Sequence, residues 1–337
     1  MSRPITSEML PANLLDHKAV KAWSQLQPER VEPEGLEIVK LKNKSAVYRL
    51  LGLGPNGSAV IAKRCPSRTA VIERRIYEEL LPLLPVPTLR CYGFVEDTDG
   101  DYCWLFLEDA EDAGGQMYSP LNPEHRALAG RWLATLHTAL AQLGPANGLP
   151  DRGVSHYLAL LRACRGKALQ HLDNPVLPAD DVAVLQTIAS YCDVLEAHWS
   201  EMAEICDCLP PSLVHGDFVI KNVRVRATSS GLVLLPFDWE YSGWGVPATD
   251  VAQFVGGTVS PDLAAYHSVV ERSVGGLDGR DMQRLAECGA FFRWLDDISW
   301  EILYLTYQPY KYLSGYMRCL KMYEPRMAKA LQAAQWL

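Results

Sequence analysis

The sequence predicts an α+β protein in which a small β-rich part is followed by a larger, mostly helical part. Residues 36–107 contain five short runs rich in Val, Ile, Leu and aromatic residues, separated by turn signals. Beyond residue 108, apolar residues recur at steps of three and four over long stretches, which is typical of helices that pack along one side. We therefore predict an N-terminal lobe over residues 1–107 and a C-terminal lobe over residues 108–337.

Five strands and one main helix are predicted in the first part. The run GLGPNG at Gly52–Gly57 is a strong turn signal, which makes the first three strands an antiparallel meander. The helix covers Thr69–Leu84, and the prolines in Pro85–Pro87 end it. A short helix is also predicted at His17–Leu26, within an otherwise irregular N-terminal stretch. The strands are predicted at Leu36–Leu41, Ala46–Leu51, Ser58–Lys63, Leu89–Glu96 and Tyr102–Leu107.

The second part begins after Glu108–Tyr118, an acidic stretch that we interpret as the connection between the lobes. Asn122 and Pro123 are typical of a helix N-terminus, because an Asn side chain caps the first turn and Pro tolerates the first helical position. The apolar face of this helix is predicted to contain Leu133, Leu136, Leu140 and Leu143. Further helices are predicted from about Pro178 to Met202, at Asp281–Tyr307 and at Glu324–Leu337.

Composition and charge exclude several classes of function. The 337 residues carry a formal net charge of −8 and no long Lys or Arg run, which argues against non-specific binding of nucleic acid. No apolar run approaches the length of a membrane span, and the N-terminal MSRPITSEML lacks the apolar core of a signal peptide. Nine cysteines without framework spacing indicate reduced thiols. We therefore expect a cytoplasmic protein without a membrane or nucleic-acid partner.

The most informative stretch is Leu213–Asp238, with the sequence LVHGDFVIKNVRVRATSSGLVLLPFD. Its apolar runs are too short for helices and rich in Val and Leu, so they are predicted to be strands. Asp217, Asn222 and Asp238 then follow strand ends on one hairpin-like unit. Because adjacent carboxylates repel and an unpaired buried charge is costly, this arrangement predicts a bound cation.

The pattern HGDxxxxN at His215–Asn222, followed by Asp238, resembles the aminoglycoside phosphotransferase/choline kinase family. The segment PFDWEYSGWGVPATDVA at Pro236–Ala252 is similar to that family's DWE…G…P…D segment, and the resemblance extends over almost the whole chain. It implies a two-lobed protein-kinase-like fold. It also implies an O-phosphotransferase that uses ATP and Mg²⁺ and acts on a hydroxyl of a small molecule, such as an aminoglycoside, an amino alcohol or a sugar. GTP in place of ATP stays open.

The resemblance, together with the needs of phosphoryl transfer, assigns roles to residues of this stretch. Asp217 is predicted to be the catalytic base that orients the acceptor hydroxyl. Asn222 and Asp238 are predicted to bind Mg²⁺, a hard cation that prefers oxygen ligands. Lys221 is predicted to stabilise charge on the transferring phosphoryl group, with a solvated loop lysine as the alternative. Asp250 resembles the family's aspartate that supports the catalytic loop.

In the first part, the resemblance assigns Lys63, at the end of the third strand, to the nucleotide phosphates. Its carboxylate partner is expected on the following helix, where Glu73 fits best and Glu78 and Glu79 are the alternatives. A strand-end lysine that reaches solvent is the alternative for Lys63 itself.

The nucleotide loop departs from the protein-kinase pattern, since neither a GxGxxG before a Val nor a GxxxxGK[ST] occurs in the sequence. The polar run KNKS at Lys42–Ser45 lies between the first two predicted strands. Ser45 and nearby backbone amides are therefore predicted to contact phosphate. Backbone groups near Leu107 and Glu108 are predicted to contact the edge of the base.

The C-terminal helices are predicted to line the acceptor pocket. Asp297 and Glu301 are spaced i, i+4 and share a helix face, with Trp300 nearby. Such a group could hold a cationic or polyhydroxylated substrate through charge and aromatic contacts. The alternative is an ordinary acidic helix surface with aromatic residues in the core.

Two other functions stay open. One is a catalytically weak, kinase-like protein that binds nucleotide or regulates, but the joint presence of Lys63, Asp217, Asn222 and Asp238 argues against it. The other is a metal-dependent phosphohydrolase, whose sites usually need more His and Asp ligands than this stretch offers.

Overall fold

A computed structural model describes residues 13–27, 32–42, 44–97, 100–112, 114–142, 144 and 148–337. Leu143, which the sequence assigned to an apolar helix face, lies outside them. The chain forms two compact units. Unit 1 contains the described residues up to Tyr118 together with Lys221–Ser242, and unit 2 contains Ser119–Ile220 and Gly243–Leu337. The lobe boundary after residue 107 stays a prediction.

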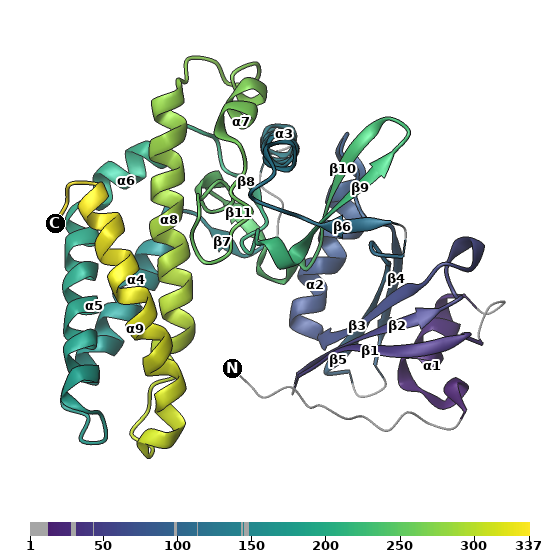
Figure 1. The fold of residues 1–337 in the computed structure, drawn as a ribbon, viewed down its shortest axis with the longest axis horizontal. Coiled ribbons are helices and arrows are strands. Elements are labelled where there is room, and N and C mark those ends of the chain that lie inside the picture. Colours follow the sequence, from purple (N-terminus) through teal and green to yellow (C-terminus); the bar gives the residue numbers. More distant parts are fainter. Residues whose placement is uncertain are drawn as a thin grey trace. The chain divides into compact units, whose positions relative to one another are not determined.

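Unit 1 is built on a five-stranded antiparallel sheet with the strand order β1-β2-β3-β5-β4 (Figure 1), which confirms the predicted sheet. The predicted turn between the second and third strands contains a 3₁₀ turn, in which Asn56 and Gly57 have φ angles of 57° and 79°. Asn and Gly tolerate this left-handed backbone best. The strands are β1 (Gly35–Lys42), β2 (Ser45–Leu51), β3 (Val60–Pro66), β4 (Cys91–Glu96) and β5 (Tyr102–Glu108).

The two faces of this sheet differ in character. One face packs on α1 (Lys18–Leu26), whose Trp23 lies in a core with Leu50 and Phe106. Because side chains alternate along a strand, the residues between these core positions point to the opposite face. That opposite face carries Val47, Arg49, Ile61 and Lys63, where Val47 pairs with Lys63 and Arg49 with Ile61 across β2 and β3.

The helix predicted at Thr69–Leu84 is divided into three segments. α2 (Ser67–Arg75) is followed by a π-helical turn at Ile76–Leu80 and a 3₁₀ turn at Leu81–Leu83. Pro82 lies in the last segment, where it lacks an amide donor and crowds the preceding turn, so a regular α-helix does not continue through it.

A second, three-stranded sheet in unit 1 consists of β10 (Gly231–Pro236), β9 (Val223–Thr228) and β6 (Gly115–Met117). Pro236 pairs with Val223, so Asn222 and Asp238 flank the open end of the β9–β10 hairpin. The predicted single hairpin-like unit for all three polar residues is wrong. The strand before Asp217 is β8 (Ser212–Val214), which pairs with β11 (Gly243–Gly245) in a small sheet of unit 2 that also contains β7 (Asp151–Arg152).

Unit 2 is mostly helical. In Figure 1, α8 lies beside α9, α4 packs against both α5 and α8, and α3 pairs with α7. The side chain of Asn122 caps α3 by accepting a hydrogen bond from Glu124 N at 2.9 Å, as the sequence predicted. The helices are α3 (Pro123–Ala141), α4 (Val154–Gln170), α5 (Ala179–Ala197), α6 (Trp199–Cys206), α7 (Leu263–Val270), α8 (Gly279–Ile302) and α9 (Tyr310–Ala333).

Four helices differ from the prediction, and one of them is the helix expected at Asp281–Tyr307, which ends at Ile302. The one expected from about Pro178 is interrupted at His198 and continues as α6. The last helix begins at Tyr310 instead of Glu324 and continues through Pro325. α4 has no counterpart in the prediction. In the part of the chain that the structure describes, no helix combines the length and apolar character that crossing a membrane requires.

Candidate functional site

The ammonium group of Lys63 lies among three carboxylates in unit 1, and we call these four residues the Lys63 cluster. Its Nζ donates hydrogen bonds to Glu73 Oε1 (2.6 Å) and to Asp238 Oδ1, and Glu240 Oε2 lies 3.9 Å away. The lysine comes from β3, Glu73 from α2, and the other two carboxylates from the segment just after β10. The structure therefore brings together residues far apart in the sequence, including the favoured pair of Lys63 and Glu73.

The two alternative partners of Lys63 lie elsewhere. Glu78 Oε2 pairs with Arg74 at 2.9 Å, and Glu79 Oε2 pairs with Arg75 at 3.3 Å. Both are i, i+4 pairs between the end of α2 and the π-helical turn that follows it, and both involve exposed glutamates.

The Lys63 cluster carries more negative than positive charge. Burial raises the pKa of Glu73 to about 7, with Lys63 opposing this effect and Asp238 adding to it. Burial, followed by Asp238, also raises the pKa of Glu240. Burial disfavours the charge of Lys63, but the neighbouring carboxylates outweigh it and hold the lysine pKa well above its ordinary value. The cluster can therefore accept a further cation.

The donor atoms of the cluster fit a hard divalent metal. Glu73, Asp238 and Glu240 each offer one oxygen, and these oxygens lie within 4.8 Å of one another. Glu73 Oε2 is buried, and within the described ranges no donor bonds to it. Asn222 is buried at the same end of the hairpin, where its backbone carbonyl accepts a hydrogen bond from Phe237 N at 3.0 Å. Carboxylate and amide oxygens are the ligands that suit Mg²⁺.

Asp238 has a backbone conformation that is uncommon for a residue with a side chain. Its φ and ψ angles are 70° and 59°, in the left-handed region. This conformation costs roughly 1–2 kcal/mol for an L-residue, although Asp tolerates it better than most. Strain of this kind persists where the surroundings fix the residue, and it is frequent at functional sites.

Three further polar residues share the face of the sheet that carries Lys63. Lys40 pairs with Val47, which in turn pairs with Lys63, and cross-strand partners point to the same side. By the same alternation, Lys42 and its partner Ser45 also lie on this face. Burial, followed by Lys42, lowers the pKa of Lys40, while two carboxylates of the Lys63 cluster act in the opposite direction. This edge of the sheet is therefore cationic beside an acidic cluster.

An apolar pocket of about 140 Å³ lies on the same face of the sheet. Leu107 and Glu108, predicted near the nucleotide base, both line it. The amide of Glu108 donates to Arg90 O at 2.8 Å, so this amide is engaged within the protein. The apolar wall is formed by Val39, Val47, Ile61, Leu89, Leu107, Ala110 and Phe237.

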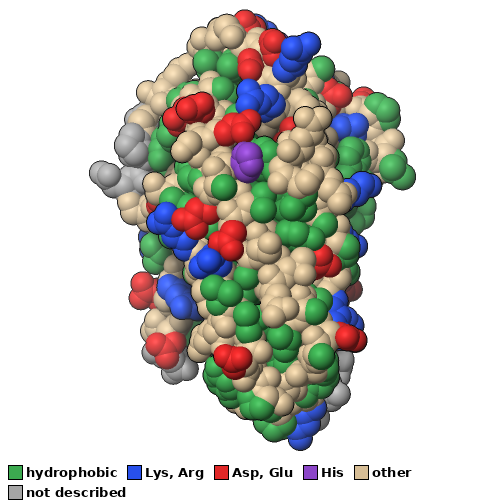
Figure 2. All heavy atoms as spheres, turned by 90° about the vertical axis from the view of Figure 1, so that its left-hand side faces the viewer, with side chains coloured by type: hydrophobic (Ala, Val, Ile, Leu, Met, Phe, Trp, Pro, Cys, Tyr) green, Lys and Arg blue, Asp and Glu red, His purple; other side chains and the backbone are tan. Residues whose placement is uncertain are grey.

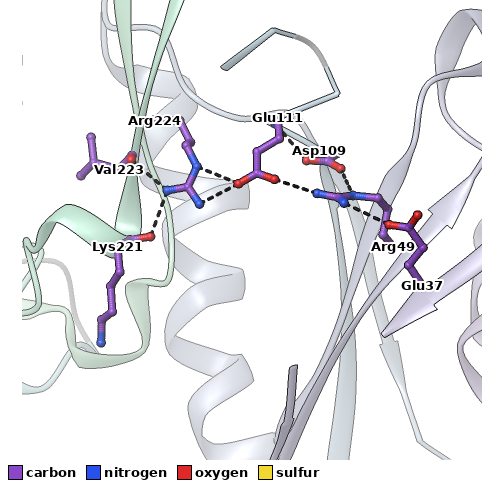
Figure 3. Close-up of polar contacts among 7 residues, drawn as sticks. All are labelled: Glu37, Arg49, Asp109, Glu111, Lys221, Val223 and Arg224. Carbon is purple, nitrogen blue, oxygen red and sulfur yellow. Dashed lines mark hydrogen bonds and ion pairs between the residues drawn. The ribbon is translucent and has the colours of Figure 1, made fainter. Parts of the chain in front are cut away.

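A chain of ion pairs holds one side of this pocket (Figure 3). Glu111 links two arginines: its Oε2 accepts from Arg49 at 2.9 Å, and its Oε1 accepts from Arg224 at 3.1 and 2.9 Å. Arg49 pairs in addition with Asp109 and Glu37. Because these residues come from β1, β2, β9 and the stretch after β5, the ion pairs connect the large sheet with the hairpin of unit 1.

Lys221 lies at the hairpin end of this chain. Its carbonyl oxygen accepts a hydrogen bond from Arg224 Nη1 at 3.1 Å, while its side chain extends away from the arginine (Figure 3). Lys221 is exposed, and its charge contributes to lowering the pKa of Lys40, behind burial and Lys42. Its positive charge therefore adds to that of the cationic edge described above.

Asp217 lies in unit 2, in the loop that follows β8. Asp250 holds this loop, since its two carboxylate oxygens accept hydrogen bonds from His215 N (2.7 Å) and Gly216 N (3.0 Å). Gly216 has a φ of 75°, which favours glycine. Asp217 Oδ1 accepts a hydrogen bond from Arg293 Nη2 at 3.3 Å. The support by Asp250 agrees with its predicted part in the loop, whereas Arg293 was not anticipated.

The acidic residues predicted on α8 differ in their surroundings. Asp297 Oδ1 lies 3.9 Å from Arg293 Nη2, close to Asp217. Burial raises the pKa of Asp296 and of Asp297 to about 6, with Arg293 opposing the effect in both cases. Glu301, one turn further, lies near Cys319 of α9, where it adds to the effect of burial in raising the pKa of that thiol. Glu301 also contributes to raising the pKa of Asp297, behind burial and Asp217, so the two carboxylates lie near each other.

Trp300 is 49% exposed and lies in a row of stacked aromatic rings. Its ring centroid is 6.5 Å from that of Tyr304, which lies 6.1 Å from Tyr316, and both ring pairs are inclined by 18°. Other exposed apolar residues of this region are Leu303, Tyr307 and Tyr312. Figure 2 shows one face of unit 2 with mixed charges above and hydrophobic side chains gathered toward its lower end.

Sequence reasoning missed Glu240 and Arg293. Glu240 could have been found, because it stands two residues after Asp238 in the run DWE. Arg293 belongs to the run RWLDD on a long helix, where nothing in the sequence indicates which residue points to the loop before Asp217.

Comparisons with known proteins agree with the fold. A family model described as "Phosphotransferase enzyme family" matches residues 42–288. No curated protein sequence matches the chain. A macrolide 2'-phosphotransferase from Brachybacterium faecium has 14% identity and a TM-score of 0.57, covering 90% of this chain and 98% of its own.

Two further solved structures are similar to the same extent. The GDP complex of wild-type aminoglycoside 2'-phosphotransferase-IIIa has 13% identity and a TM-score of 0.58, covering 91% of this chain and 97% of its own. An ethanolamine kinase from Plasmodium vivax has 15% identity and a TM-score of 0.55, covering 92% of this chain and 89% of its own. At such identities the likeness shows the fold, which is the predicted kinase-like one.

Proposed function

Since this chain belongs to the phosphotransferase enzyme family and is a small-molecule kinase, we propose that it transfers the γ-phosphoryl group of ATP to a hydroxyl of its substrate in a Mg²⁺-dependent reaction. The single observation that carries the proposal is the Lys63 cluster, in which one lysine bonds to both Glu73 and Asp238. Phosphoryl transfer needs cations around the phosphates, ligands for the metal and a carboxylate for the attacking hydroxyl.

The apolar pocket of unit 1 is assigned to the nucleotide base. Its apolar walls would enclose a flat ring, and the side chains of Glu108, Asp109 and Glu111 supply its polar edge. The ion pairs around Glu111 keep that edge in place. ATP is the proposed nucleotide. GTP is the alternative, and its binding to the same pocket has to be tested.

The triphosphate is assigned to the cationic edge of the sheet. Lys63 is proposed to pair with phosphate oxygens while Glu73 keeps its ammonium group in position. Lys40, Lys42 and Ser45 share its face, so they are proposed to supply the charge and the hydrogen-bond donor that a Gly-rich loop would otherwise provide. Lys221 is proposed to stabilise the transferring phosphoryl group.

Asp238 and Asn222 are proposed to hold Mg²⁺, with Glu240 as a further carboxylate near them. When bound, the metal would neutralise charge on the phosphate oxygens. Asp238 keeps its carboxylate at the cluster through its left-handed backbone and its bond to Lys63. Asp217 is proposed to orient the acceptor hydroxyl and to take its proton during transfer.

The acceptor is proposed to be an alcohol that also carries a cationic amine, as an amino alcohol or an aminoglycoside does. The support is the negative charge near Asp217, where Asp296 and Asp297 have pKa values raised to about 6 by burial. An ammonium group on the substrate would relieve this charge. Trp300 and Glu301 are proposed to contribute aromatic and acidic contacts at the periphery.

The decisive experiment measures nucleotide binding and transfer separately. Mg-ATP must raise the melting temperature if it binds the native protein, and Mg-GTP is the comparison. ATP consumption is then screened with amino alcohols, aminoglycosides and neutral sugars, and the phosphorylated product is identified by mass spectrometry. Absence of a thermal shift with both nucleotides would contradict the proposal, whereas free phosphate without a phosphorylated acceptor would favour a phosphohydrolase.

A further inference from the structure

Arg293 is a buried arginine of α8 whose hydrogen-bond partners belong to the loop at Asp217. Only 6% of the residue is exposed. Its Nη1 donates to Gly216 O at 2.7 Å, and its Nη2 donates to Asp217 Oδ1 at 3.3 Å. Burial opposes its charge, but Asp297, Asp217 and Asp296 outweigh this and raise the pKa of Arg293, which therefore stays charged.

A glycine brings α8 close enough for this contact. Gly289 lies one helical turn before Arg293 and on the same face of α8. A Cβ atom added to Gly289 would lie 1.8 Å from Ala248 O, so the helix touches the backbone of the short turn at Pro247–Thr249. Asp250, which holds the loop amides, directly follows this turn. The close approach of α8 to the turn at Pro247–Thr249 thus places both Asp250 and Arg293 beside the loop before Asp217.

The peptide before Asp217 is consequently held from both sides. The amide of Gly216 donates to Asp250, and the carbonyl of Gly216 accepts from Arg293. The second arm of the same guanidinium reaches the carboxylate of Asp217. A planar guanidinium can bind a carbonyl and a carboxylate at once with fixed angles, whereas the ammonium group of a lysine is a compact charge on a flexible stem.

We propose that Arg293 is a positioning residue for Asp217: it fixes the Gly216 peptide and one oxygen of the Asp217 carboxylate, and so sets the direction in which the other oxygen meets the acceptor hydroxyl. This inference rests on the proposed function of Asp217. The guanidinium group of Arg293 would then align two carboxylates, that of Asp217 and that of Asp297, which also lies on α8.

The test compares Arg293→Met and Arg293→Lys with Arg126→Met. Arg126 is a matched control, because it also lies in unit 2, is partly buried, and donates to a carbonyl (Ser260 O, 2.8 Å) and to a side chain (Gln253 Oε1, 2.9 Å). Both Arg293 variants are expected to lower kcat about 10²-fold, because a small misplacement of a reacting group costs this much. The KM for Mg-ATP should change less than about threefold, since the proposed base pocket and phosphate-binding residues belong to unit 1.

A chemical rescue separates positioning from a structural role. Guanidinium ions added to Arg293→Ala are expected to restore part of kcat, because they can enter the space left by the side chain and make the same two hydrogen bonds. Arg126→Ala should show no such response. Wild-type kcat in Arg293→Lys, or a loss in Arg293→Ala that guanidinium does not reverse, would overturn the proposal.

Hydrogen exchange tests whether Arg293 holds the loop before Asp217, and this measurement does not require enzymatic activity. In Arg293→Met, amides in the segment 213–220 should exchange about tenfold faster than in the wild type and in Arg126→Met. Unchanged exchange in that segment would overturn the inference even if the proposed function were correct. If the wild type transfers no phosphate to any acceptor, the proposed function fails, and the exchange measurement still reports whether Arg293 holds the loop. Arg293→Lys, which keeps the buried charge, provides the same comparison if Arg293→Met does not fold.

Discussion

Each unit of this protein has a cation that lies among carboxylates, Lys63 in unit 1 and Arg293 in unit 2, but the two cations hold their partners differently. Lys63 in unit 1 bonds to two side chains, those of Glu73 and Asp238. Arg293 in unit 2 bonds to a backbone carbonyl as well as to Asp217. A lysine ammonium is a compact charge that can exchange partners, whereas an arginine guanidinium fixes two partners in one plane.

The different partners of Lys63 and Arg293 indicate what each unit is suited to do. In the proposed reaction, the compact ammonium group of Lys63 would exchange a carboxylate partner for a phosphate oxygen. The group around Arg293 is suited to keep one geometry, since moving the arginine would release the peptide before Asp217. The carboxylates of the Lys63 cluster that are not balanced by the lysine could thus bind a metal. The carboxylates of Asp296 and Asp297 could bind a cationic acceptor or take up protons.

The largest expected effect comes from removing one carboxylate in each unit. Asp217→Asn keeps the shape of the side chain but cannot take a proton, so kcat should fall about 10²–10⁴-fold. Mg-ATP should still raise its melting temperature as in the wild type. Asp238→Asn should lose the Mg²⁺-dependent part of that thermal shift together with activity, because its carboxylate belongs to the cluster of oxygens that we propose to bind the metal.

If Asp217→Asn and Asp238→Asn respond to Mg-ATP in the same way, the two carboxylates do not have separate roles. The control is Asp262→Asn, which removes a carboxylate from the N-terminal cap of α7. It should retain both turnover and the response to Mg²⁺, because Asn caps a helix about as well as Asp does. Unaltered turnover in Asp217→Asn would remove Asp217 from its proposed role. Full Mg²⁺-dependent stabilisation of Asp238→Asn would remove Asp238 from the proposed metal site.

Replacing Lys63 should have the next largest effect. Lys63→Met removes the cation from between Glu73 and Asp238, so phosphate binding weakens and kcat/KM for Mg-ATP should fall about 10²–10³-fold. Lys63→Arg should restore little of this, because a planar fork does not fit a position that a compact ammonium group occupies. Activity near that of the wild type in Lys63→Arg would show that the two cations are interchangeable and that the comparison fails. Steady-state kinetics at varied Mg-ATP measures both variants.

Much of this arrangement could be predicted from local sequence. The five strands alternate or follow turn signals, and Asp238 follows the end of β10 as predicted. Lys63 was expected at the end of the third strand, but it lies in the middle of β3, which continues to Pro66. What the sequence could not give is the direction of a side chain on a long helix. Arg293 and Glu301 both lie on α8, yet one points to the loop before Asp217 and the other to α9.

Strand pairing was the other limit. The run before Asp217 is as apolar as the runs after Asn222, so composition alone could not tell that β8 pairs with β11 rather than with the hairpin. That choice depends on contacts between residues far apart in the chain. The start of α9 is a further example, since the predicted helix at Glu324–Leu337 covers only the second part of a helix that begins at Tyr310.

A smaller effect is expected at the cationic edge of the sheet. Lys40→Met and Lys42→Met should each raise the KM for Mg-ATP about three- to tenfold, as expected for the loss of a partly solvated charge contact. Adenosine, which lacks phosphates, should compete equally well with the wild type and both variants. Lys44→Met is the control, because Lys44 lies outside β1 and β2, next to this edge. An equal rise in KM in all three variants would show that the change depends on net charge alone. Weaker adenosine binding in Lys40→Met or Lys42→Met would contradict the proposed contact of these lysines with phosphate.

The smallest effect concerns stability and pH. The pKa of Asp297 is raised from its ordinary value to about 6, chiefly by burial, so the folded state holds this proton more tightly than the unfolded state does. The stability that this group contributes is therefore complete below about pH 4 and is lost as the pH rises through 6. Asp297→Asn stays neutral and should be more stable than the wild type by about 1–2 kcal/mol at pH 7.5, with no gain at pH 4. Urea unfolding at both pH values measures this, with Asp207→Asn, an exposed aspartate of the same unit, as the control. A gain that is equal at both pH values would mean that the acid near Asp217 is already neutralised within the protein, and the proposed attraction for a cationic acceptor would lose its basis.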